Sequence, residues 1–170
     1  IGGDPARIIA QIVTGVGFGL VALSLQLPSF FAVCIALLAI IAFSGATHDI
    51  ATDGVYMSEL NKQEQAKYIG WQGAFYNIAK IVASGGLVWL AGWLLTKFNE
   101  GGGAEAQQEA TVKAWMTVML ILGGVMLLLG FYHARILPSG GKQEAAQLYT
   151  ASETLKRLLE VIGDFFKKKH

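Results

Sequence analysis

Four long apolar stretches, separated by short polar connections, make up most of the chain. They run over residues 6–26, 29–60, 68–95 and 111–133. As a helix, each stretch is long enough to cross a hydrocarbon layer of roughly 30 Å at about 1.5 Å per residue. Strands are a poor alternative, because the runs far exceed the roughly ten residues of a barrel strand and show no alternation. The pattern predicts an all-α membrane protein with a four-helix transmembrane segment over residues 1–137.

The segment after the fourth stretch has a different pattern. Pro138-Ser-Gly-Gly ends the helix, and Thr150 with Glu153 matches a capping box. Apolar residues then recur at helical spacing opposite basic ones, which predicts an amphipathic helix over about 151–168. We expect residues 138–170 to form a cytoplasmic linker whose helix lies on the inner membrane surface, with a groove on a partner protein as the alternative.

Composition agrees with the membrane prediction and excludes several kinds of chemistry. Hydrophobic residues are 54% of the chain and charged residues 15%. The single cysteine, Cys34, lies in an apolar run, so a disulfide framework is excluded and a packing role is expected. The chain has no nucleophile elbow, phosphate loop or zinc-protease motif. We therefore expect no enzyme, no cofactor, no metal and no nucleic-acid partner.

Basic residues are distributed unevenly among the connections. The start of the chain, the connection from Asn61 to Lys67 and the segment after the fourth span hold ten lysines and arginines, Arg7 among them, whereas the opposite side holds only Lys97 and Lys113. The positive-inside rule makes the richer side cytoplasmic, so both ends are expected inside. Because the chain begins with Ile1, we expect it to be a piece of a longer protein.

The first and fourth spans contain few polar residues and are expected to pack and to face lipid. Small residues on these spans allow close approach of neighbouring helices. They are Gly15, Gly19, Gly123 and Gly124. His133, beside Arg135 at the end of the fourth span, is expected to anchor the helix at the membrane edge.

The third span has one polar stripe. Gln72, Tyr76, Lys80 and Ser84 are spaced by four, so they share one side of the predicted helix. Lys80 lies about 13 residues, roughly 20 Å, from the turn at Lys67, deeper than a lysine tail comfortably reaches from water. An ammonium at this depth needs a partner or a watery cavity.

The second span has a matching acidic stripe. Asp49, Asp53 and Tyr56 share one face, with His48 beside it. If the second and third spans form an antiparallel hairpin, Asp49 lies level with Lys80. We expect one carboxylate to pair with Lys80 and another to exchange a proton, because two acids four residues apart repel and one pKa rises. Alternatively, the acids emerge into the cytosol, or the ion pair is only structural. His48 is a candidate proton relay, and a metal site is not expected without a second histidine or a cysteine nearby.

The segment SGATHDIATDGVYMSELNKQEQAKYIGWQGAFYNIAKIVASGGLVWLAG, residues 44–92, resembles the fourth and fifth transmembrane helices of AmpG-type muropeptide permeases of the major facilitator superfamily. Those proteins have a comparable S-A-T-Q-D-I-x-x-D segment, a short polar turn and a helix ending in S-G-G. The resemblance implies that the four spans are the third to sixth of twelve, followed by the central cytoplasmic connection. Asp49 and Asp53 match the family's paired acids. His48 stands where glutamine is common, and the arginine that usually follows the second acid is absent.

The resemblance implies a secondary active transporter of the inner (cytoplasmic) membrane. We expect proton-coupled import of a polar solute such as a muropeptide or a sugar, with Asp49, Asp53, His48 and Lys80 in coupling. The candidates for the solute cavity are Tyr56, Gln72, Tyr76 and Ser84. The expected partners are the lipid bilayer, a small polar solute, protons and the remainder of the chain. The alternative is a non-transporting membrane scaffold or sensor.

Overall fold

The computed structural model describes residues 5–99 and 102–136, and every regular element in this part of the chain is helical. The elements are α1 (Pro5–Ser24), α2 (Phe30–Glu59), α3 (Lys62–Ile81), the π-helical turn η1 (Val82–Gly86), α4 (Leu87–Phe98) and α5 (Ala104–Ile136). The predicted linker and amphipathic helix, over 138–170, lie outside the described residues.

Four helices are long and apolar enough to cross a membrane, as the hydropathy pattern predicts. Two of them are α1 and α2, the third runs without a break through α3, η1 and α4, and the fourth is α5. The third has 37 residues and the fourth has 33. At about 1.5 Å per residue, these two reach well beyond a hydrocarbon layer of roughly 30 Å. The described part of the chain is therefore all-α, with the build of a multi-pass membrane protein.

The connection between α2 and α3 is shorter than the sequence prediction of Asn61 to Lys67. The helix α3 begins at Lys62, because the Asn61 side chain accepts hydrogen bonds from the backbone N–H groups of Gln63 and Glu64, both at 3.0 Å. The Glu64 carboxylate accepts a bond from the Asn61 N–H in return, at 3.0 Å. This capping box satisfies donors that a helix start otherwise leaves without partners. The helix therefore begins six residues before the start of the apolar run at Tyr68.

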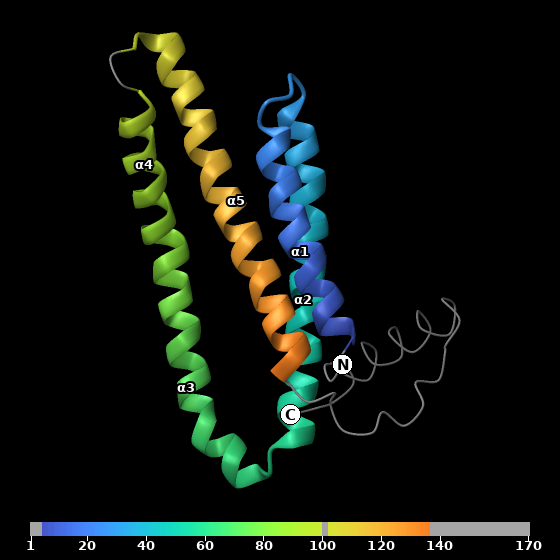
Figure 1. The fold of residues 1–170 in the computed structure, drawn as a ribbon. Helices are drawn as coiled ribbons and strands as arrows, with labels where there is room; N and C mark the ends of the chain where they lie inside the picture. Colours follow the sequence, from blue (N-terminus) through green and yellow to red (C-terminus); the bar gives the residue numbers. More distant parts are fainter. Residues whose placement is uncertain (1–4, 100–101, 137–170) are drawn as a thin grey trace, which may run out of the picture.

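The most closely packed part of the structure joins α1 to α2 and to α5 (Figure 1). Where α1 crosses α5, a Cβ built on Gly123 would lie 2.7 Å from the Gly15 carbonyl oxygen, so only glycine permits this approach. A Cβ built on Gly19 or on Gly124 would meet nothing within 4 Å. The small-residue prediction is thus confirmed for one glycine of each pair.

The helix α4 packs against the first half of α5 through a small apolar cluster. Its buried residues are Ala91 and Leu94 of α4 and Ala114 and Val118 of α5. Figure 1 shows α5 running obliquely, near α4 at one end and near α1 and α2 at the other. The helix α5 thus lies between α1 and α2 on one side and the continuous helix of α3 and α4 on the other. The helices α2 and α3 diverge from the turn that joins them (Figure 1).

The helix α3 has no buried residue among those described. The contacts it makes with α2 lie at the shared turn, where the Tyr56 hydroxyl donates to the Gln65 carbonyl oxygen at 2.6 Å. The surface of α3 beyond this turn is therefore open to lipid or to another part of the protein.

A buried hydrogen bond between α1 and α2 provides a test of this packing. The Ser44 hydroxyl, buried on α2, donates to the Ala10 carbonyl oxygen at 2.8 Å. We expect Ser44→Ala to lower the free energy of unfolding by about 1 kcal/mol, because one buried interhelical hydrogen bond is lost. The midpoint of thermal unfolding in detergent, followed by tryptophan fluorescence, should fall by roughly 2–4 °C. Ser58→Ala is the control, since the exposed Ser58 bonds only within its own helix, to Val55. Equal midpoints for the two variants would contradict the packing described.

Candidate functional site

The polar stripe predicted on the third span lies on α3 and the first residues of η1. Gln72, Tyr76, Lys80 and Ser84 are all exposed. The Lys80 ammonium lies 5.4 Å from the centroid of the Tyr76 ring, which is a cation–π distance. The Ser84 hydroxyl donates to the Lys80 carbonyl oxygen at 2.7 Å. The stripe is thus a connected surface on one side of the helix, as its spacing predicts.

Lys80 lies at the middle of the longest helix. It is 18 residues after Lys62 and 18 before Phe98, the two ends of the continuous helix. Each end is therefore roughly 27 Å away along the axis. In the described part of the chain, Lys80 forms no ion pair. Lys80 thus has an aromatic contact but no counter-charge among residues 5–99 and 102–136.

A π-helical turn follows Lys80 directly. Residues Val82–Gly86, with sequence VASGG, form η1 between α3 and α4. A π turn places one more residue in a helical turn than an α-helix does, and such turns occur frequently at functional sites. The local widening lies next to Lys80 and contains Ser84, so the backbone is irregular where the stripe ends.

The acidic candidates lie on the outer side of α2. The side chain of Asp49 is 84% exposed, and its carboxylate oxygen lies 3.5 Å from His48 Nδ1. Asp53 is exposed too, and it takes part in no ion pair within the described helices. Both acidic side chains therefore lie on the accessible surface of α2.

The two polar stripes do not meet in the described helices, contrary to the expectation of an antiparallel hairpin with Asp49 beside Lys80. The expected pair is not formed, because α2 and α3 touch at their turn and then diverge on either side of α5 (Figure 1). The prediction assumed that consecutive helices pack along their whole length. Instead, α1 packs against both α2 and α5, and α4 packs against α5.

A second polar cluster, which the sequence analysis did not single out, lies where α1 begins and α5 ends. Arg7 and Gln11 are buried on α1, with 2% and 4% of their surface exposed. Gln11 bonds to His133 Nδ1 of α5, with Gln11 Nε2 at 2.9 Å and Oε1 at 3.1 Å. His133 therefore contacts α1 from the last turn of α5, and its expected role as an anchor at the membrane edge stays a prediction.

A pocket of about 380 Å³ opens beside this cluster. The helix α2 contributes residues spaced along one face, and α1 and α5 contribute one each. The lining residues are Arg7, His48, Thr52, Val55, Tyr56, Glu59, Leu60 and His133. Of the sequence candidates, His48 and Tyr56 face this pocket, whereas Asp49 and Asp53 do not line it.

One signal for this cluster was present in the sequence. Arg7 and Gln11 are four residues apart on a helix with few other polar residues, the same spacing that identified the Lys80 stripe. Arg7 was counted only as a cytoplasmic charge. The contribution of His133 could not be inferred, because it depends on how α5 crosses α1.

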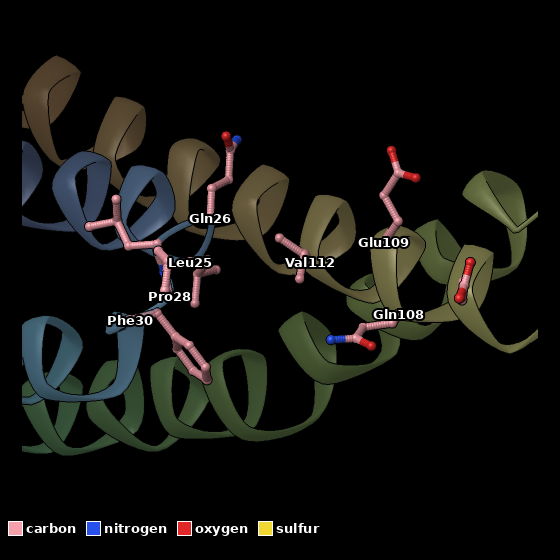
Figure 2. Close-up of a pocket in the computed structure, with 9 residues that line it drawn as sticks. Leu25, Gln26, Pro28, Phe30, Gln108, Glu109 and Val112 are labelled. Atoms are coloured by element: carbon pink, nitrogen blue, oxygen red, sulfur yellow. The ribbon is translucent and has the colours of Figure 1, made fainter.

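A larger hollow, of about 550 Å³, lies at the other end of the helices. Figure 2 shows its residues coming from the turn between α1 and α2 and from the first turns of α5. Gln26, Gln108 and Glu109 are its labelled polar residues. It contains none of the candidate residues, and its charged lining residues are Glu105 and Glu109, the second of which pairs with Lys113.

Within residues 5–99 and 102–136, no group of three or more histidine, cysteine, aspartate or glutamate side chains is placed to hold a metal ion. Comparison of the chain with protein-family models, with characterised proteins and with solved structures found no match.

Proposed function

We propose that the protein is a secondary active transporter that moves a small polar solute across a membrane together with protons. The position of Lys80 is the observation that supports this most strongly. An ammonium at the midpoint of a membrane-length helix is costly unless it faces water, a solute or another charge. Ionisable residues in membrane spans are for this reason associated with solute and ion pathways.

The surroundings of Lys80 agree with a solute pathway. Gln72, Tyr76 and Ser84 supply hydrogen-bonding groups and an aromatic ring along the same exposed face. The π turn beside Lys80 is a backbone irregularity of the kind that transport helices have near their binding sites. In the proposed mechanism, Lys80 binds an anionic part of the solute or an acidic side chain from the rest of the protein.

The acids on α2 are the proposed proton carriers. Asp49 and Asp53 are four residues apart, so they share one exposed face of α2. His48, 3.5 Å from Asp49, is a relay for the transferred proton. Solute and proton movement are coupled if solute binding near Lys80 changes the protonation of these acids. This change would accompany the alternation between a state open to the outside and a state open to the inside.

The identity of the solute follows from the resemblance of residues 44–92 to muropeptide permeases of the major facilitator superfamily. We propose a cell-wall muropeptide or a sugar, imported through the inner membrane, with both ends of this chain on the cytoplasmic side. Aromatic side chains such as Tyr76 present flat faces that suit sugar rings.

Proton uptake by proteoliposomes containing the full-length protein tests the proposal. Vesicles loaded with a pH-sensitive dye should acidify inside when an anhydro-muropeptide is added outside, and a protonophore or the omission of the protein should remove the response. A free sugar of similar size, added in parallel, distinguishes the two solute classes. If neither solute moves protons or itself enters the vesicles, a scaffold or sensor becomes the better assignment.

A further inference from the structure

Two residues that line the pocket where α1 begins and α5 ends have buried nitrogen atoms without a hydrogen-bond partner in the described part of the chain. Arg7 Nε and Nη2 are buried and unbonded, and so is His48 Nε2. Both residues line the same pocket, one from α1 and one from α2. A buried polar nitrogen without a partner is unfavourable, and a buried guanidinium without one is more so.

The two free nitrogens of Arg7 lie on one edge of its guanidinium. Nε and Nη2 point the same way, and this edge matches two oxygens of a carboxylate or a phosphate group. His48 adds a third nitrogen from a different helix, so the three do not belong to one flat group. A tetrahedral oxyanion, which offers oxygens out of one plane, suits such a set better than a planar carboxylate does.

The charge and size of the pocket agree with an anion. Arg7 is permanently charged, and the start of α1 adds the positive end of a helix dipole. The volume of about 380 Å³ equals roughly a dozen water molecules at about 30 Å³ each, which is ample for a phosphate group. Glu59 lines the same pocket, but its exposed carboxylate forms no ion pair with Arg7 or His48.

The pocket also lies at the right depth for a charged group. Arg7 is in the first turn of α1 and His133 is in the last turn of α5, so both are within about one turn of the helix ends (Figure 1). Residues so close to the ends of membrane-length helices lie near the headgroups of a bilayer.

We propose that this pocket binds a phosphate group through Arg7 and His48, with Gln11 holding His133 at its rim. The phosphate comes either from a dissolved phosphate compound or from the headgroup of an anionic phospholipid. This site is distinct from the Lys80 stripe, and it does not depend on the transport proposal.

Thermal unfolding of the full-length protein tests the site in two arms. In the first, the protein is held in an uncharged maltoside detergent, and inorganic phosphate is compared with chloride at equal ionic strength. In the second, nanodiscs of phosphatidylcholine are compared with nanodiscs that also contain phosphatidylglycerol. Binding at about 100 times the Kd should raise the unfolding midpoint by about 5 °C. A shift in the first arm assigns dissolved phosphate, and a shift in the second arm alone assigns lipid.

Matched variants connect the effect to the pocket. Arg7→Gln should abolish the shift, whereas Arg135→Gln, which removes an exposed arginine at the same end of α5, should keep it. If the unfolding midpoint shifts in neither arm, the proposal is overturned. It is also overturned if Arg7→Gln and Arg135→Gln lose the shift equally. Glu59→Gln gives a second test if Arg7→Gln does not fold. Removing this negative charge from the pocket should strengthen phosphate or phosphatidylglycerol binding a few-fold, and unchanged or weaker binding also overturns the proposal.

Discussion

Replacing Lys80 with methionine is expected to reduce solute-driven proton uptake by the full-length protein roughly 100-fold or more, the size of effect typical of removing a group that takes part in proton transfer. Methionine keeps the length of the side chain and removes the charge. If Lys80 binds the solute or an acidic side chain from the rest of the protein, no other residue of its stripe replaces the lost ammonium, because Gln72, Tyr76 and Ser84 are neutral. The rate of solute-driven proton uptake is measured in dye-loaded proteoliposomes that contain the variant.

Lys97 provides a matched control on the same continuous helix. Its ammonium lies 5.9 Å from the Trp93 ring centroid, similar to the 5.4 Å between Lys80 and Tyr76, but it is in the last turn of α4. Lys97→Met removes the same charge and the same kind of aromatic contact near an end of the helix. It should transport at close to the normal rate. Full activity of Lys80→Met, or an equal loss in both variants, would exclude the assigned role of Lys80.

Replacing Gly123 with leucine is expected to have the largest effect on stability. A Cβ at Gly123 would meet the Gly15 carbonyl oxygen at 2.7 Å, and one at Gly15 would meet Leu127 Cγ at 2.8 Å. A backbone oxygen cannot rotate away as a side chain does, so α1 and α5 must separate. Overpacking of this kind costs about 3 kcal/mol, which lowers the unfolding midpoint by roughly 6–12 °C for a chain of this size.

Gly124→Leu is the neighbouring control. Nothing lies within 4 Å of a Cβ built at Gly124, so the added side chain enters open space. Thermal unfolding of both variants in the same detergent should separate them clearly. Similar midpoints would mean that α1 and α5 do not pack through Gly123.

The existence and order of the helices could be predicted from hydropathy, because each apolar run is long enough to require a helix in a membrane. Their ends were less predictable. The third helix begins at Lys62 and the fourth at Ala104, in polar residues that form helices well but do not raise hydropathy. The cap at Asn61 could have been recognised from the N-x-x-E spacing, which is a capping-box pattern.

The arrangement of the helices was harder to infer, and the candidate sites depend on it. The polar spacing that leads to Lys80 places Tyr76 beside it correctly, because both lie on one helix. The expected contact of Lys80 with Asp49 required two helices to pack, and hydropathy does not determine which helices meet. Arg7, His48 and His133 come from three helices, so their shared pocket follows only from the packing of α1 against both α2 and α5.

The π turn also determines where this helix can lose one residue without changing the contact between α4 and α5. A turn closed by an i to i+5 bond accommodates one residue more than an α-helical turn, so losing one residue between Ile81 and Leu87 restores ordinary helix on both sides. Ala91 and Leu94 would then keep their orientation towards α5. A deletion elsewhere in this helix would rotate the following residues by about 100° and remove that contact. A homologous protein shorter by one residue here would therefore align with a gap inside VASGG.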